Sequence, residues 1–173
     1  MHQQIPPRFP LEQRTRAGLH FYIKNTKSTS MEQYKYQAEI NALIQQGLKM
    51  PLVVKPNNLK GFRFTFKNDI GKSYLPNYIM KPQRAIIANQ RKVDIGGYAL
   101  SCFTDKGKAF KFYHLLAKSM RNISKSIGDS ISSGNISNTD GNITVPSANG
   151  HFNLFEFPSC DLSNTFRLEE ELS

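Results

Sequence analysis

The chain has 173 residues, of which 39% are hydrophobic and 11% aromatic, and this composition is sufficient for a buried core and excludes a wholly disordered protein. Its two cysteines are too few for a disulfide framework, and no apolar run reaches the length of a membrane span. The composition therefore predicts an intracellular protein without a membrane partner, cytoplasmic in general and nuclear or nucleoid-associated if it binds DNA.

The basic residues are concentrated in one part of the chain. Residues 1–125 carry 22 basic and 6 acidic side chains (+16), whereas residues 126–173 carry 1 and 7 (−6), which together give the net charge of +10. A surface this basic attracts polyanions, and an acidic segment of the same chain can compete with them for it.

The first part of the chain is read as an arm followed by a single domain. Residues 1–17 are polar and rich in proline, which predicts an extended arm. Residues 18–173 are expected to form one α+β domain, with the acidic segment at about 135–173 docked on it. Its first strand is predicted at Leu19–Ile23.

A helix is predicted next. Thr29 and Glu32 have the spacing of a capping box, and Gly47 is placed to end the helix. Its apolar residues share one face at helical spacing, namely Tyr36, Ile40, Leu43, Ile44 and Leu48.

The clearest strand pattern is Phe62–Lys67, which alternates aromatic and polar side chains. Phe62, Phe64 and Phe66 point to one face, and Arg63 and Lys67 to the other. Burying Arg and Lys without partners costs roughly several kcal/mol, so we expect buried phenylalanines and a basic outer face. Further strands are predicted at Arg84–Ala88 and Tyr98–Phe103.

Two short segments resemble the motifs of the RNA-recognition-motif family. Phe21-Tyr-Ile-Lys-Asn25 is similar to its short ribonucleoprotein motif, and Lys60-Gly-Phe-Arg-Phe64 to the start of its octamer. The resemblance implies that Tyr22, Phe62 and Phe64 stack on bases at an open sheet face. In the second half of the octamer the inward positions would be polar, so the alternation favours burial of the phenylalanines instead.

A long helix is predicted from Thr104 or Asp105 to about Ser133, with Gly128 as a possible break. Its apolar stripe comprises Ala109, Phe112, Tyr113, Leu116, Met120, Ile123, Ile127 and Ile131. Almost opposite that stripe lies a set of cations that we call the basic ridge: Lys108, Lys111, Lys118, Arg121 and Lys125.

The last third of the chain is predicted to contain a hairpin over Ile136–Val145, turning at Asp140-Gly141, then a strand at His151–Phe157. Asp161 could cap a short helix that ends in Glu169–Glu171. The elements together predict an α+β fold: a mostly antiparallel sheet of five to six strands, packed by two main helices near residues 31–47 and 105–130.

One segment suggests an enzyme as an alternative. Tyr98-Ala-Leu-Ser-Cys-Phe103 is similar to the middle segment of ADP-ribosyltransferases, a family that includes toxins. The resemblance implies that His20, Ser101 and Glu156 position a nucleotide and carry out the transfer. The alternative without a catalytic role is that Glu156 points outward from a half-exposed strand.

Other chemistry is not indicated. The four histidines lack zinc spacing, and Gly71-Lys-Ser73 lacks the upstream glycine of a phosphate-binding loop. Cys102 lies on a predicted buried strand, where a thiol is usually inert. We therefore expect no metal, no cofactor and no catalytic residue.

The favoured function is non-enzymatic binding of nucleic acid, RNA or DNA, or of another polyanion, with contacts mainly to phosphates. A module that binds or inhibits an acidic protein is the other alternative, and either role fits a component of a larger assembly. The predicted binding residues are the basic ridge (Lys108, Lys111, Lys118, Arg121 and Lys125) together with Arg63, Lys67, Arg84, Arg91 and Lys92.

Overall fold

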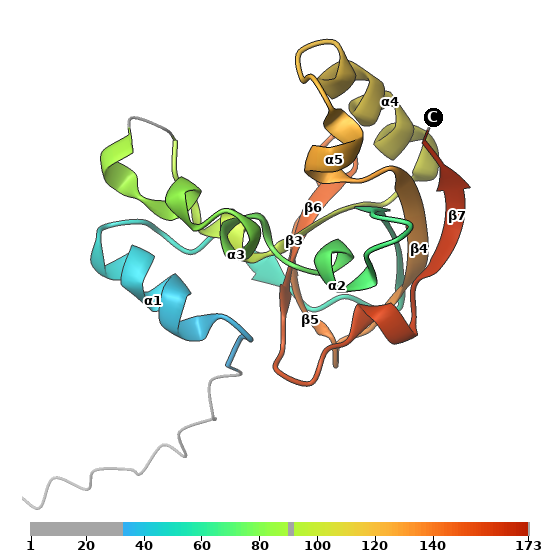
Figure 1. The fold of residues 1–173 in the computed structure, drawn as a ribbon. Helices are drawn as coiled ribbons and strands as arrows, with labels where there is room; N and C mark the ends of the chain where they lie inside the picture. Colours follow the sequence, from blue (N-terminus) through green and yellow to red (C-terminus); the bar gives the residue numbers. More distant parts are fainter. Residues whose placement is uncertain (1–32, 90–91, 173) are drawn as a thin grey trace, which may run out of the picture. The chain divides into compact units, whose positions relative to one another are not determined.

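A computed structural model describes residues 33–89 and 92–172 (Figure 1). The predicted arm at 1–17, the strand at Leu19–Ile23, the capping box of Thr29 and Glu32, and Arg91 lie outside the described residues.

The described residues form an α+β structure around one antiparallel sheet. Its seven strands follow the order β1-β5-β6-β3-β2-β4-β7, one strand more than the upper value expected from the sequence. Their bounds are β1 Val53–Val54, β2 Leu59–Thr65, β3 Leu100–Phe103, β4 Ser130–Ile136, β5 Gly141–Thr144, β6 His151–Glu156 and β7 Arg167–Glu171.

The helical elements of the described part are short, apart from α1 and α4. They are α1 Gln37–Gln45, α2 Ile70–Ser73, α3 Asn77–Met80, α4 Lys106–Ala117 and α5 Ile123–Ile127, with 3-10 turns η1 Pro82–Ala85, η2 Ile87–Asn89, η3 Ile95–Tyr98 and η4 Leu162–Asn164. None of these helices is long and apolar enough to cross a membrane.

Both faces of the sheet carry hydrophobic cores. On one face lies a core built on β3 and β6, which includes Leu100, Cys102, Phe152, Leu154 and Phe166. On the opposite face two separate cores pack at opposite ends of β3. One joins α1, α3 and η3 to Ala99 and Phe155, and the other joins α4 to Phe103 and Ile131. In Figure 1, α4 and α5 accordingly lie at one end of β3, and α1 and α3 lie at the other.

The predicted basic outer face of β2 is wrong. Arg63 is only 7% exposed and Thr65 only 4%, whereas Phe62 and Phe64 are half-buried. The prediction assumed that a buried arginine would lack partners, but the Arg63 guanidinium donates to three carbonyl oxygens. Lys67 is exposed at the end of this segment, as expected.

The predicted long helix is two helices and the start of a strand. α4 ends at Ala117, Asn122 adopts a left-handed conformation, and α5 then runs only to Ile127. Gly128, with a φ of +133°, breaks the segment, and its ideal Cβ would lie 2.5 Å from the Thr65 carbonyl oxygen. Ile131 is buried in the same core as Ala109, although it belongs to β4.

The predicted hairpin over Ile136–Val145 is not formed. β4 pairs with β2 and β7, whereas β5 pairs with β1 and β6, so the turn at Ser137–Asp140 connects strands that are not neighbours. Asp140 holds this turn by accepting hydrogen bonds from the Ser137 amide and hydroxyl.

Two further assignments from the sequence are wrong. The segment predicted as a strand at Arg84–Ala88 forms the 3-10 turns η1 and η2. The acidic run Glu169–Glu171 belongs to β7, which pairs with β4, and not to a helix. Asp161 does act as a cap, but for the short turn η4.

Candidate functional site

A cleft of about 510 Å³ opens over the middle of β3 and β6, between the two separate cores. Ala99, just before β3, and Phe103 at its end each enter one core, and Ser101 between them stays exposed. His151 and Asn153 occupy the same face of β6 and complete the floor. The alternation of two strands thus places polar side chains where neither helical layer covers the sheet.

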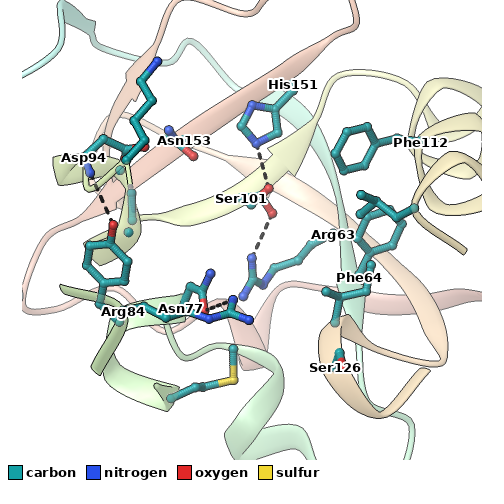
Figure 2. Close-up of a pocket in the computed structure, with 18 residues that line it drawn as sticks. Arg63, Phe64, Asn77, Arg84, Asp94, Ser101, Phe112, Ser126, His151 and Asn153 are labelled. Carbon is teal, nitrogen blue, oxygen red and sulfur yellow. Dashed lines mark hydrogen bonds between the residues drawn. The ribbon is translucent and has the colours of Figure 1, made fainter. Parts of the chain in front are cut away.

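The walls of the cleft come from two groups of helices. Asn77 and Arg84 approach from α3 and η1, with Asp94 and Lys92 beside η3, while Phe112 of α4 and α5 residues form the opposite wall. Figure 2 shows Ser101 at the centre, with His151 above it and the Arg63 guanidinium below it. Arg84 donates to Asn77 Oδ1 at 3.0 Å, which holds its guanidinium on the rim.

Arg63 joins the cleft floor to its wall. β2 and β3 pair at only one register position, Phe62 with Phe103. Beyond it, Arg63 Nη1 donates to the Ser101 carbonyl oxygen at 2.8 Å, and its other nitrogens donate to Ser73 O at 2.8 Å and Leu75 O at 3.3 Å. The guanidinium therefore supplies the Ser101 carbonyl oxygen with the donor that a longer ladder would have provided, and it also satisfies two carbonyl oxygens outside the sheet.

Ser101 and His151 form a hydrogen-bonded pair on the cleft floor. Ser101 Oγ lies 2.7 Å from His151 Nε2. The imidazole ring packs edge-on against Phe103, with ring centroids 5.3 Å apart. Burial lowers the pKa of His151, and the nearby Asp94 carboxylate opposes that shift. The imidazole is therefore favoured in its neutral form.

Several cations line the cleft or lie next to its lining residues. Arg84 and Lys92 line it, Lys81 follows Met80, and Lys125 precedes Ser126. Burial lowers the pKa of Lys81, and the charges of Arg84 and Lys72 lower it further, which identifies three neighbouring cations. Lys72 also donates from Nζ to the Lys125 carbonyl oxygen at 3.3 Å, and so connects this group to α5. We call Lys72, Lys81, Arg84, Lys92 and Lys125 the cationic rim. Among the described residues, none of the five has an acidic side chain within ion-pair distance.

The acidic strand β7 neutralises a different set of lysines. Glu169 pairs with Lys60 at 3.4 Å, Glu170 pairs with Lys106 at 3.3 Å, and Glu171 pairs with Lys67. Ser133 and Lys60 also bond to Glu169 and lower the pKa of its carboxyl group. Lys67, one of the predicted binding residues, is thus occupied by the chain itself.

The basic ridge is exposed but does not lie on one helix. Lys108 and Lys111 are on α4, Lys118 and Arg121 follow its end, and Lys125 is on α5. Lys108 Nζ donates to the Ala148 carbonyl oxygen at 3.3 Å. The structure brings Arg63, Arg84 and Lys92 to the cleft. Lys67 lies with β7, and Arg91 is outside the described residues.

The residues of the transferase alternative are not brought together in the described part. Ser101 lies on the cleft floor, whereas the Glu156 side chain lies on the other face of the sheet, where it pairs with Lys35 at 3.3 Å. Burial raises the pKa of Glu156 despite Lys35, and Glu156 Oε2 has no hydrogen-bond partner among the described residues. Glu156 is therefore buried and does not point outward, and His20 lies outside the described residues.

Burial and the attraction between Lys35 and Glu156 affect the pKa values of the two groups differently. Burial lowers the pKa of Lys35, but the Glu156 carboxylate and the Tyr36 hydroxyl outweigh this and raise it overall. Glu156 is 2% exposed at its side chain against 35% for Lys35. Burial therefore dominates the pKa of Glu156, whereas the attraction between the charges dominates the pKa of Lys35.

Several site residues were missed from the sequence: His151, Asp94, Asn153, Lys72 and Lys81. The strands of Ser101 and His151 were both predicted, but 50 positions separate the two residues, and only the pairing of β3 with β6 brings them together. Lys72 and Lys81 are neighbours through short turns that the sequence pattern did not resolve. The only feature of the sequence that pointed to Lys72 and Lys81 as site residues was the low content of acidic residues in this part of the chain.

Neither a protein-family model, nor a curated protein, nor a solved structure matches this chain. Within residues 33–89 and 92–172, no group of three or more His, Cys, Asp and Glu side chains is placed to hold a metal ion.

Proposed function

We propose that the protein binds nucleic acid through its phosphate backbone, at the cationic rim and in the cleft beside it. The observation that carries the proposal is the set of cations at the cleft. Arg84 and Lys92 line it, Lys72, Lys81 and Lys125 lie beside its lining residues, and none of the five is paired with an acid among the described residues. A cluster of this kind is electrostatically unfavourable in the isolated protein. A polyanion relieves the repulsion and releases its own counterions when it binds.

The distribution of acids supports this assignment. Three of the exposed lysines are paired with β7, and the cationic rim is left without such partners among the described residues. A surface that only maintained solubility would mix both signs. The remaining cations of the basic ridge extend the same charge along α4 and beyond it.

The cleft favours a single strand over a duplex. Its volume of about 510 Å³ lies within the range of small-ligand sites, roughly 300–1,000 Å³. A flexible strand can place one nucleotide unit in such a cleft while neighbouring phosphates contact Lys81, Arg84 and Lys125. Asn77 and Asn153 offer amides to that unit, and Phe64 and Phe112 offer aromatic edges or faces.

The test is the salt dependence of binding to labelled oligothymidylate and oligouridylate, measured by fluorescence anisotropy. Lys81→Ala, Arg84→Ala and Lys125→Ala are each expected to weaken binding. Each should also reduce the slope of log affinity against log salt by about 0.7, the contribution of one phosphate contact on a single strand.

Lys67→Ala is the matched control, because it removes the same charge from a lysine that is already paired with Glu171. It should leave the slope nearly unchanged. Equal effects of Lys67→Ala and Lys81→Ala, or binding that does not respond to salt, would contradict the proposal. Absence of binding to both oligonucleotides at low salt would also contradict it and would leave an acidic protein as the partner to seek.

A further inference from the structure

The pair of Ser101 and His151 has the geometry of a nucleophile and its base. The Ser101 hydroxyl is exposed on the cleft floor, and its oxygen lies 2.7 Å from Nε2 of the imidazole. In the tautomer protonated at Nδ1, Nε2 accepts the hydroxyl proton. A serine becomes a competent nucleophile when an adjacent base can remove that proton.

The surroundings hold this pair in place. The Ser101 backbone is fixed by pairing of β3 with β6 and by the bond from Arg63 to its carbonyl oxygen. The edge-on contact with Phe103 orients the imidazole. Asp94 acts electrostatically on His151 and would stabilise the imidazolium that forms when the proton is taken up. Rigid strands therefore present both groups side by side on the cleft floor.

The charges around the pair select an anionic substrate. Arg63, Arg84 and Lys92 line the cleft, and Asp94 is the single acid among its lining residues. Two of these cations also belong to the cationic rim, so a backbone phosphate bound there lies next to the cleft floor. Cations beside a phosphorus centre stabilise the charge that develops on its oxygens during substitution.

We propose that Ser101 is a nucleophile and His151 its general base, and that they cleave a phosphodiester held in the cleft. This inference rests on the proposed binding of nucleic acid. Ser101 Oγ forms a bond to phosphorus while its proton passes to His151 Nε2. The bond from phosphorus to the leaving sugar oxygen breaks. Because an in-line displacement places that oxygen opposite Ser101 Oγ, it takes a proton from solvent water, while His151 keeps the proton of Ser101.

Water completes the cycle without any further reactant. It attacks the phosphoserine diester, gives its proton to the solvent and displaces Ser101 Oγ, which recovers its proton from the His151 imidazolium. The products are one strand that ends in a phosphate and one that ends in a hydroxyl. The atoms balance as hydrolysis, and no electron donor or acceptor is required.

The first experiment uses a phosphonofluoridate probe, which phosphonylates activated serines, followed by intact mass and peptide mapping. We expect one adduct, at Ser101. Ser101→Ala should abolish it, and His151→Asn should slow it at least about a hundred-fold, the lower end of the effect of a general base. Ser126→Ala is the matched control, since Ser126 also lines the cleft, and it should react normally.

No adduct at Ser101, or an unchanged rate in His151→Asn, would overturn the proposal. The exposed position of Ser101 makes Ser101→Ala tolerable for folding, and thermal unfolding of every variant verifies this. Hydrolysis of bis(4-nitrophenyl) phosphate that Ser101→Ala abolishes would support the substrate class. Hydrolysis of 4-nitrophenyl acetate alone would overturn that class.

The proposal of nucleic-acid binding and the proposal of cleavage can be contradicted by different results. Ser101→Ala should retain salt-dependent binding of the oligonucleotides. Such binding without an adduct in the wild-type protein would overturn the nucleophile and leave the binding function intact. Probe labelling and diester hydrolysis without oligonucleotide binding would support the nucleophile and overturn nucleic acid as its substrate.

Discussion

Arg63 Nη1 lies 2.8 Å from the carbonyl oxygen of Ser101, on a strand with which β2 otherwise pairs at a single position. The same guanidinium donates to Ser73 and Leu75, which precede α3 and the cleft wall. One buried cation thus connects the floor of the cleft with the segment that leads to its cationic rim.

Replacement of Arg63 should be strongly destabilising. Arg63→Lys cannot reach three carbonyl oxygens from one nitrogen, and buried polar groups left without partners cost roughly 1–3 kcal/mol each. We expect the free energy of unfolding to fall by about 3 kcal/mol in urea denaturation. Lys67→Met, on the same segment, removes only an exposed ion pair and should lower it by less than about 1 kcal/mol. Similar losses in the two variants would contradict the role given to Arg63.

Neutralising β7 should strengthen binding of nucleic acid. Replacement of Glu169, Glu170 and Glu171 by Gln frees Lys60, Lys106 and Lys67. The salt slope for a single strand should then increase by up to about 2, at about 0.7 for each added phosphate contact. Glu39→Gln is the control, because it raises net charge on α1 without releasing any of these lysines. An unchanged slope in the triple variant would show that β7 does not compete with the ligand.

Glu156→Gln should change the pH dependence of stability. Burial raises the pKa of Glu156 above its ordinary value of 4.5, so its contribution to stability is complete below that value and is lost as pH rises through the folded pKa. The unfolding free energy of the wild type should therefore fall relative to Glu156→Gln between acidic and neutral pH. Denaturation curves of both proteins at matched pH give the difference. A constant difference would mean that the carboxylate is not destabilised by burial.

Both thiols should be inert in the native protein. Burial raises the pKa of Cys102 to about 12, although Arg63 acts in the opposite direction. Burial also raises the pKa of Cys160, and the charge of Glu156 adds to this effect. We expect no reaction with a disulfide reagent at mildly alkaline pH until guanidinium chloride unfolds the chain, after which both thiols should react. Rapid labelling of either thiol in the native state would contradict the burial described.

Gly141→Ala should disrupt the start of β5. An ideal Cβ at Gly141 would lie 2.1 Å from the Phe155 carbonyl oxygen, and a backbone atom of a neighbouring strand cannot move away easily. We expect a loss of more than about 2 kcal/mol in unfolding free energy, in the range of steric and backbone effects. Gly71→Ala is the control, since its nearest atom would be 3.8 Å away and Ala favours the helix. It should be neutral or slightly stabilising.

The α+β class and the approximate positions of β2, β3, β5 and β6 could be predicted from apolar patterns and turn residues, because each of these strands carries core residues. The prediction from periodicity was wrong where apolar residues at helical spacing belong to both a helix and the strand that follows it. Ile123, Ile127 and Ile131 have helical spacing, yet Asn122 and Gly128 interrupt the helix and Ile131 enters the same core from β4. The spacing of apolar residues indicates which residues are buried, but it does not indicate whether they belong to a helix or to a strand.

The candidate site was harder to predict because it is a product of strand order. Asp140-Gly141 has the sequence of a hairpin turn, but β4 and β5 separate to different parts of the sheet. Ser101 and His151 meet only through the pairing of β3 with β6. Arg63 illustrates a further limit, since backbone carbonyl oxygens that lie far away in the sequence offset the penalty for burying its charge.

The position of β7 in the chain has a consequence for synthesis. The other six strands leave the ribosome before it, so the outer edge of β4 remains unpaired and Lys60, Lys67 and Lys106 remain uncompensated until Glu169–Glu171 follow. During that interval the nascent domain is more positive than the finished one by the three charges that these glutamates cancel, beside a particle made largely of RNA. Completion of the sheet and the reduction of that charge are therefore a single event in the maturation of the chain.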